Sequence, residues 1–404
     1  MQQLIDNQKV LLDAFQRKAY ISRDLYQDID SNHRLTALVG SRGVGKTTYL
    51  LHKALTLQNK NIPVLYISAD NIYFLDHKLL DLIDNVYKET DIRHVLIDEI
   101  HKYENWNQEL KNIYDIYLEM NIVFTGSSMI DIIKSKYDLS RRVIMRKIHG
   151  LSFREYLQFK LGAKTNVIKL EDIITAHVKL ASKLAIHNIL KHFNDYLTNG
   201  YYPFFIEFNE VADFQQAVEN SFQKTIYEDI ASSKKLKTPT LLILEKLFKY
   251  VVSSSAGELN ANKLASHLQK DFTNISEYLS ILHEAGLIRF LHRNKSGKSV
   301  LRNPEKMLPN NTNMMMAINL VKHTDDMRGK LRETFLLSQL QNAGHHAYLP
   351  TKGDFIVDHY TFEVEGKSKT AEQINHIDHA FLLADGIEVG FGNKIPLYLF
   401  GFLY

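Results

Sequence analysis

The fold is decided by the stretch Leu35-Thr36-Ala37-Leu38-Val39-Gly40-Ser41-Arg42-Gly43-Val44-Gly45-Lys46-Thr47-Thr48, an apolar run that leads through a glycine-rich loop into a helix. Its spacing, G-x-x-x-x-G-K-[ST], is that of a phosphate-binding loop. Gly40 and Gly45 let the backbone curl, so that successive N–H groups and the positive end of the helix surround phosphate groups. In such a loop Lys46 reaches the β- and γ-phosphates, and the Thr47 hydroxyl binds Mg²⁺. We therefore expect a nucleotide-binding domain built on a parallel sheet.

Six residues of this loop are the candidate nucleotide contacts. They are Gly43, Val44, Gly45, Lys46, Thr47 and Thr48. The ligand that they fit is ATP with Mg²⁺, and the charge of Lys46 contributes to catalysis. The apolar run before the loop and the amphipathic run after it, residues 47–57, supply the strand and the helix that the motif requires.

Composition sets the outer limits. A length of 404 residues suggests two or three domains, and 45% hydrophobic with 24% charged residues is ordinary for a globular chain. The net charge of +3 is too small to indicate nucleic acid or membrane by itself. The absence of cysteine excludes disulfides, thiolate metal sites and cysteine nucleophiles. With no signal-peptide pattern at Met1-Gln2-Gln3 and no apolar run approaching about 18 residues, we expect a cytoplasmic protein with no membrane partner.

A second signal follows in the stretch His94-Val95-Leu96-Ile97-Asp98-Glu99. An acid at the C-terminal end of a parallel strand lies in the crevice where α/β sheets bind ligands, which suits Asp98 to Mg²⁺. Glu99 can then polarise the attacking water as a general base. Many strands end in solvated acids, but an acid pair about 50 residues after a phosphate-binding loop favours catalysis.

A third strand is expected at Asn121-Ile122-Val123-Phe124-Thr125-Gly126-Ser127-Ser128. Some P-loop ATPases insert a strand between the strand of the loop and the strand of the acids, and a polar residue on it senses the γ-phosphate. Thr125 and Ser127 are the candidates here, ahead of Ser128. The alternative is a turn whose hydroxyls cap the next helix.

Arg141 and Arg142 suggest an arginine finger. A guanidinium supplied by a neighbouring subunit stabilises charge on the transferred phosphoryl group, which would make the protein a homo-oligomer. Consecutive side chains diverge, so at most one of the two points at phosphate, and Arg142 is our candidate. The alternative is a solvated basic pair.

Several segments resemble a large prokaryotic family of AAA-type ATPases. They are Ile97-Asp98-Glu99-Ile100-His101-Lys102-Tyr103, Trp106, Leu110-Lys111-Asn112-Ile113-Tyr114-Asp115, Phe124-Thr125-Gly126-Ser127-Ser128, Leu139-Ser140-Arg141-Arg142 and Gly150-Leu151-Ser152-Phe153-Arg154-Glu155-Tyr156. Members of this family usually end in a restriction-endonuclease-like domain. The resemblance spans nearly the whole chain and is densest before residue 160.

The resulting fold class is α/β, with four modules. Residues 1–150 form the AAA-type P-loop core with N-terminal helices over 4–27, and 151–231 form a helical lid over the nucleotide. A polar linker at 232–239 leads to a winged helix at 240–302, and 325–404 form a restriction-endonuclease-like α/β domain.

The winged helix is expected from three helices, 241–252, 261–268 and 274–284, a strand at 287–291, and a turn at 294–299 leading to Val300-Leu301. Its third helix carries Glu277 and Glu284 and no Lys or Arg, the wrong charge for DNA phosphates. The basic residues gather in the wing at Arg293, Lys295, Lys298 and Arg302. A protein-contacting or architectural module is favoured over a wing-led DNA contact.

The last module is predicted as a helix at 330–343, strands at 346–349, 353–357 and 360–365, a helix at 370–380 and a strand at 396–404. In active members of this fold, two strand acids bind a metal and a nearby lysine orients water. The candidate nuclease residues are Glu333, Asp354, Glu363, Glu365 and Lys367. The expected lysine position holds Glu365, and Lys367 restores the spacing only if the register slides by two, so cleavage activity is in doubt.

The sequence thus predicts a Mg²⁺-dependent ATPase that couples ATP binding and hydrolysis to movement of its C-terminal modules. Two alternatives stay open. One is an ATP-gated nuclease acting on DNA, and the other is a non-hydrolysing, nucleotide-dependent switch that binds a protein partner.

Overall fold

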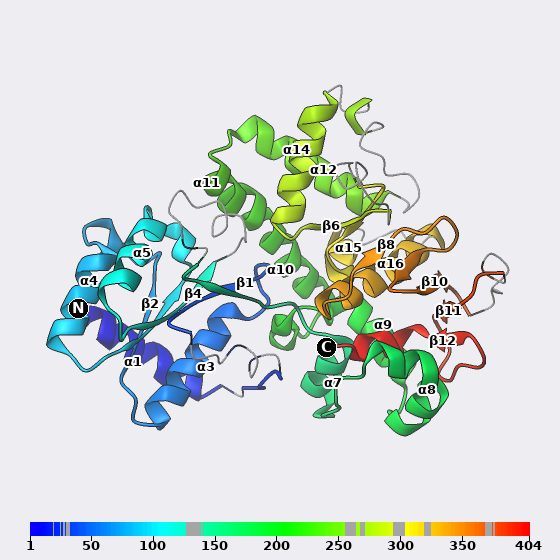
Figure 1. Cartoon of the computed structure of the whole chain (residues 1–404), viewed down its shortest axis with the longest axis horizontal. Coiled ribbons are helices and arrows are strands. Elements are labelled where there is room, and N and C mark those ends of the chain that lie inside the picture. Colours follow the sequence, from blue (N-terminus) through cyan, green and yellow to red (C-terminus); the bar gives the residue numbers. More distant parts are fainter. Residues whose placement is uncertain are drawn as a thin grey trace. The chain divides into compact units, whose positions relative to one another are not determined.

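The structure is a computed structural model. It describes residues 1–18, 20–24, 26, 29, 33–126, 139, 141–254, 264–266, 271–293, 304–318, 325–367, 374 and 376–404. The chain divides into two compact units (Figure 1). The first comprises Met1–His149 with Ser232–Lys235, and the second comprises Gly150–Ala231 with Leu236–Tyr404.

The first unit is built on a five-stranded sheet in which every pairing is parallel, in the order β2-β3-β4-β1-β5. The strands are β1 (Leu35–Val39), β2 (Val64–Ser68), β3 (His94–Asp98), β4 (Asn121–Gly126) and β5 (Ile144–Lys147). β1 is buried at every position, as a strand covered on both faces must be. The predicted parallel sheet is confirmed, and β4 lies between the loop strand β1 and the acid strand β3.

Helices cover both faces of this sheet. They are α1 (Gln2–Gln16), α3 (Lys46–Asn59), α4 (Leu79–Glu89) and α5 (Trp106–Ile116), with short 3₁₀ turns at Ile72–Leu75 and Ile100–Lys102. In Figure 1 the α1 and α3 pair and the α4 and α5 pair lie on opposite sides of the strands. Leu4 of α1, Leu82 of α4 and Ile113 of α5 are buried in the core.

The second unit begins with helices, as the sequence predicts for its middle part. They are α7 (Phe153–Leu161), α8 (Leu170–Leu184), α9 (Ile189–Asn199), α10 (Val211–Lys224), α12 (Thr238–Ser253), α14 (Phe272–Glu284), α15 (Thr312–Ile318) and α16 (Asp325–Asn342). Two shorter segments accompany them, a 3₁₀ helix at Pro203–Glu207 and a π-helix at Thr225–Ile230. Ser152 and Glu155 form a capping box that fixes the start of α7. The segment predicted as a linker contains α11 (Ala231–Lys234), and α12 starts within it at Thr238.

Two sheets complete the second unit. The smaller pairs β6 (Ile288–Leu291) antiparallel with β7 (Lys306–Pro309). The larger has the order β12-β11-β10-β9-β8. Its strands are β8 (Ala347–Tyr348), β9 (Phe355–Val357), β10 (Tyr360–Glu365), β11 (Ala380–Ala384) and β12 (Lys394–Pro396). β8, β9 and β10 are antiparallel, whereas β11 is parallel to both β10 and β12.

The C-terminal elements differ from the prediction in two places. The expected strand over 396–404 is the short β12 followed by a 3₁₀ helix, Leu397–Phe402, whose residues are all buried. The strand β11 was not predicted, and most of the helix expected over 370–380 falls outside the described residues. A short apolar run buried on all sides has no periodicity that separates strand from helix, which explains both errors.

Much of the expected wing also lies outside the described residues. Lys295, Lys298, Val300, Leu301 and Arg302 belong to that part, as does most of the helix predicted over 261–268. Within the described residues, no helix combines the length and the apolar character needed to cross a membrane.

Candidate functional site

The glycine-rich loop adopts the backbone conformation that its sequence requires. Gly43 has a φ of 84° and Gly45 a φ of 97°, values in the left-handed region that favour glycine. Gly45 caps α3, which begins directly at Lys46. A side chain at Gly40 is also excluded, because its Cβ would lie 2.2 Å from the Ile148 carbonyl oxygen. The loop therefore leads directly into a helix N-terminus, where backbone N–H groups can bind an anion.

Lys46 lies inside this loop and is only 5% exposed. Its Nζ donates hydrogen bonds to the carbonyl oxygens of Gly40, at 2.8 Å, and Ser41, at 3.1 Å. These bonds hold the ammonium group over the loop. Phosphate oxygens entering the loop would be stronger acceptors than these carbonyls, since both partners would then be charged.

The acid pair lies at the same edge of the sheet as the loop. Asp98 ends β3, and Gly40 follows the end of β1, with only β4 between the two strands. Because all three strands are parallel, their carboxyl ends meet at one edge, where α/β sheets bind ligands. The structure thus brings together the loop and the two acids, which lie far apart in the sequence.

Asp98 is held by hydroxyl groups from both neighbouring strands. The Thr125 hydroxyl donates to Asp98 Oδ1, and the Tyr66 hydroxyl donates to Oδ2 at 3.2 Å. The carboxylate is only 3% exposed and also accepts the Glu99 backbone N–H at 3.2 Å. Burial and the nearby Asp98 charge raise the pKa of Tyr66 well above its usual value, so Tyr66 stays a hydroxyl donor. This network fixes the orientation of the carboxylate.

Glu99 follows in a left-handed conformation, with φ of 51°. Its backbone N–H donates to the Thr125 hydroxyl at 2.9 Å, and the 3₁₀ turn after it brings His101 back toward its side chain. His101 Nε2 lies 3.4 Å from Glu99 Oε2. The His101 side chain is 6% exposed and that of Glu99 is 25% exposed, so Glu99 reaches solvent beside a buried imidazole. A non-glycine residue held in this region is typical of a functional turn.

The donor set fits Mg²⁺. Thr47, on the first turn of α3, is exposed, and Asp98 supplies carboxylate oxygens at the same edge of the sheet. Hydroxyl, carboxylate and phosphate oxygens are the ligands that Mg²⁺ prefers. Of the three hydroxyl candidates on β4 and after it, Thr125 hydrogen-bonds to Asp98 and Glu99, while Ser127 and Ser128 lie outside the described residues.

Arg142 lies at the other edge of the sheet. It precedes β5, which runs parallel to β1, so it sits at the amino end of the strands, whereas the loop follows their carboxyl end. A strand of five residues is roughly 16 Å long, which separates Arg142 from the loop of its own chain.

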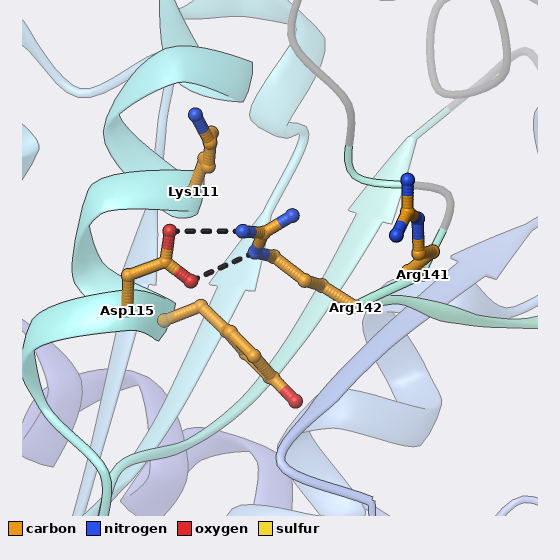
Figure 2. A pocket seen from close by; sticks show the side chains of 5 residues that line it. Lys111, Asp115, Arg141 and Arg142 are labelled. Atoms are coloured by element: carbon orange, nitrogen blue, oxygen red, sulfur yellow. Dashed lines mark hydrogen bonds and ion pairs between the residues drawn. The ribbon is translucent and has the colours of Figure 1, made fainter.

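A basic pocket surrounds Arg142 (Figure 2). It has a volume of about 440 Å³ and is lined by Lys111, Tyr114, Asp115, Arg141 and Arg142. Arg142 binds Asp115 of α5 through two bonds, Nε to Oδ1 at 2.8 Å and Nη2 to Oδ2 at 3.0 Å. These bonds lower the pKa of the Asp115 carboxyl, so it remains an anion. The Arg141 side chain lies apart from this pair in Figure 2, as expected for consecutive residues.

Three residues near the loop and the acids were missed by sequence reasoning: Arg23, Tyr66 and His101. Arg23 belongs to the irregular segment after α1, within a region predicted as plain helix. Its Nη1 donates to the carbonyl oxygens of Val44, at 3.1 Å, and His149, at 2.8 Å. Only His101 carried a signal, since it lies two residues after Glu99 within the segment that resembles the AAA-type family.

The candidate nuclease residues are brought together only in part. One region contains Glu333 of α16, Glu363 of β10 and Asp354, which precedes β9. There the Asp354 carboxylate accepts a hydrogen bond from the Val364 N–H of β10 at 2.8 Å. Lys367 is exposed, and its carbonyl oxygen accepts a hydrogen bond from Lys394. Glu365, at the end of β10, pairs with Ala384.

A lysine from outside the predicted domain occupies the space between these acids. Lys306 of β7 places its Nζ 2.8 Å from Glu333 Oε1 and 3.9 Å from Asp354 Oδ1. Among the residues that the structure describes, no group of three or more acidic or histidine side chains is arranged to hold a metal ion. The ammonium group offsets part of the negative charge that would otherwise attract a metal ion to these two acids.

Comparison with known proteins bears on the first unit. The family model described as "AAA domain" matches residues 32–157, which include the loop, the acid pair and both arginines. Residues 32–157 are therefore similar to AAA-type P-loop domains. A second family model, a domain of unknown function (DUF8612), matches residues 190–324.

A relative matches most of the chain. The uncharacterized protein MJ1637 of Methanocaldococcus jannaschii is 28% identical over 301 residues, which are 70% of this chain and 62% of the relative. The chain thus spans less than two thirds of that relative's length.

Two solved structures match this chain at low similarity. AMPPCP-bound DnaA from Aquifex aeolicus shares 15% identity over 66% of this chain and 90% of its own, with a TM-score of 0.28. The HORMA:CdnC:Trip13 complex of E. coli MS115-1 shares 13% identity over 48% of this chain and 69% of the matched chain, also with a TM-score of 0.28.

Proposed function

We propose that this protein binds Mg²⁺ and ATP at the AAA-type domain and hydrolyses the γ-phosphate bond. One observation carries the proposal: the glycine-rich loop, with Lys46 inside it, shares a sheet edge with a buried, oriented Asp98 and a solvent-reaching Glu99. Phosphoryl transfer to water needs groups that bind the phosphates and acids that hold the metal and orient the water, and this sheet edge offers both.

Each residue of the proposed site has a separate role in ATP hydrolysis. The loop N–H groups and Lys46 would bind the β- and γ-phosphates, and Thr47 with Asp98 would hold Mg²⁺, which would neutralise charge on the phosphate oxygens. Glu99 accepts a proton from the water that attacks phosphorus, while the bond from phosphorus to the leaving oxygen of ADP breaks. His101 and the Thr125 hydroxyl keep the Glu99 side chain and backbone in place.

We assign Arg142 to a site on a neighbouring copy. Because it lies at the opposite edge from its own loop, it can reach phosphate only if a second subunit docks there. The basic pocket with Lys111 and Arg141 suits the negative charge of a triphosphate. Assembly of copies would therefore complete the site, and nucleotide-driven movement of the second unit is the output that we propose.

Neither alternative gains a comparable observation. The nuclease alternative needs metal-binding acids, and the Lys306 ammonium lies against two of the candidates, Glu333 and Asp354. A non-hydrolysing switch would need no general base, and a Glu99 that follows β3 in a turn held by Thr125 and His101 supports a hydrolytic role instead.

The test is Glu99→Gln, which keeps the size of the side chain and removes its basicity. ATP binding should stay within about threefold of the wild type, whereas turnover should fall by about 100-fold or more, the usual size of general-base effects. Glu104→Gln is the matched control, because Glu104 is exposed in the same segment and the same charge is lost. Unchanged turnover in Glu99→Gln, or absence of ATP binding by the wild type, would overturn the proposal.

A further inference from the structure

The segment that precedes the sheet makes direct contact with the phosphate-binding loop. Arg23 is 1% exposed, and its guanidinium donates to the Val44 carbonyl within the loop. The same nitrogen donates to the His149 carbonyl, just after β5. Arg23 therefore ties the loop to the chain that leaves the last strand of the sheet.

These contacts set the orientation of one peptide group. In a trans peptide the carbonyl of one residue and the N–H of the next point in opposite directions. Since the Val44 carbonyl points toward Arg23, the Gly45 N–H of the same peptide group points away from Arg23. Gly45 has a φ of 97°, so this peptide could otherwise rotate freely, as glycine allows.

The surroundings support the same role. Tyr26 is buried, places its hydroxyl 3.5 Å from the Gly45 carbonyl and packs on Tyr49 of α3, with ring centroids 5.0 Å apart. The Arg23 guanidinium also lies 5.8 Å from the Tyr26 ring.

We propose that Arg23 is a positioning residue of the nucleotide site, which fixes the Val44–Gly45 peptide so that the Gly45 N–H is ready for phosphate. This rests on the proposed binding of ATP, but the orientation of the loop can also be measured without nucleotide. Arg23 does not touch the substrate, and its effect passes through the backbone of the loop.

The experiment uses the full chain with Arg23→Met and Arg23→Lys. We expect Arg23→Met to weaken binding of Mg²⁺ and ATP, measured by calorimetry, by about tenfold, the effect of losing roughly one well-placed hydrogen bond to phosphate. Its KM for ATP should rise while kcat at saturation changes less. Arg23→Lys, whose ammonium can donate to both carbonyls, should recover most of the affinity. In the absence of nucleotide, amide exchange at residues 43–46 should be faster in Arg23→Met.

Arg34 offers a matched control. Its Nη2 donates to two backbone carbonyls, Tyr114 at 2.7 Å and Tyr117 at 3.1 Å, and its guanidinium lies 4.1 Å from the Tyr114 ring. It precedes β1, at the edge of the sheet away from the loop. Arg34→Met should lower Tm by an amount comparable to Arg23→Met and leave ATP affinity and loop exchange unchanged.

The outcomes separate the inference from the proposed function. ATP affinity within twofold of the wild type in Arg23→Met, or an equal loss in Arg34→Met, would overturn the positioning role. If the wild type itself binds no ATP, the proposed function fails. Independently of that result, equal amide exchange at residues 43–46 in Arg23→Met and the wild type would show that Arg23 does not orient the loop backbone.

Discussion

Thr125 is the residue on which both acids depend. It is fully buried, donates to the Asp98 carboxylate and accepts the Glu99 N–H at 2.9 Å. It therefore contacts both the proposed metal ligand, Asp98, and the proposed general base, Glu99, from the strand that lies between β3 and β1. A residue that senses the γ-phosphate needs a hydroxyl able to bind that phosphate, whereas the Thr125 hydroxyl is already hydrogen-bonded to Asp98 and Glu99.

Thr125→Val preserves the shape of the side chain and removes both hydrogen bonds. Each is worth about 1 kcal/mol, so we expect the Mg²⁺ concentration for half-maximal ATPase activity to rise by roughly 10-fold or more. Thr36→Val is the control, since Thr36 is buried on the neighbouring strand β1 at a position nearer its amino end. A Mg²⁺ dependence identical to that of the wild type would show that Asp98 is held without Thr125.

The limits of sequence reasoning are clearest at this scale. The loop and the acid pair follow from spacing, because their chemistry requires residues close in the chain. Tyr66 and Arg23 act through contacts with residues more than 20 positions away, Asp98 and Val44, and no local pattern marks such contacts. Glu99 could be named as an acid, but its left-handed backbone could not be read from the sequence.

At the scale of elements, the parallel sheet was predictable, whereas the C-terminal unit was predicted less well. Apolar runs that end in glycine or acids identify β1 and β3. A parallel strand that is buried on both faces is recognisable because its sequence is almost continuously apolar. In the C-terminal unit, β11 has the sequence AFLLA, which suits a helix as well as a strand. Lys306 reaches the acids of that unit from β7, and the sequence had placed it outside every module.

The ion pair between β7 and α16 leads to a prediction about pH. Burial raises the pKa of Glu333 to about 7, while the Lys306 charge opposes the shift and the Asp354 charge adds to it. The folded state therefore binds more protons than the unfolded state between about pH 4.5 and 7. By linkage, the free energy of unfolding falls as pH rises through this window.

Glu333→Gln should remove that fall. We expect the free energy of unfolding of the wild type to lose roughly 1–3 kcal/mol from this group between about pH 4.5 and 7, and the variant to lose correspondingly less. The window ends where Lys330, whose pKa burial lowers to about 7, begins to contribute with the opposite slope. Asp385→Asn, which breaks the ion pair to Arg332 at 2.9 Å and leaves Glu333 in place, is the control. Denaturant titrations across this range give the slopes, and identical slopes in Glu333→Gln and wild type would contradict the assignment.

At the scale of the whole molecule, the two edges of the parallel sheet have different partners in the proposed cycle. In that proposal the carboxyl edge would bind the nucleotide of its own chain, while the amino edge would present Arg142, held by Asp115, to the nucleotide of a neighbour. A single copy would then have a complete cradle and no finger for it. This arrangement makes activity depend on assembly, and it can be tested without knowing the size of the assembly.

Lys46→Ala destroys the cradle and keeps the finger, whereas Arg142→Ala keeps the cradle and removes the finger. Each alone should have little ATPase activity. In an equal mixture, an intact cradle faces an intact finger at about a quarter of the sites of any closed ring, so roughly a quarter of wild-type turnover should return. Arg141→Ala in place of Arg142→Ala is the control and should be active without a partner. Failure of the mixture to regain activity, under conditions in which the two variants assemble together, would exclude a finger supplied between subunits and leave Arg142 as the structural partner of Asp115.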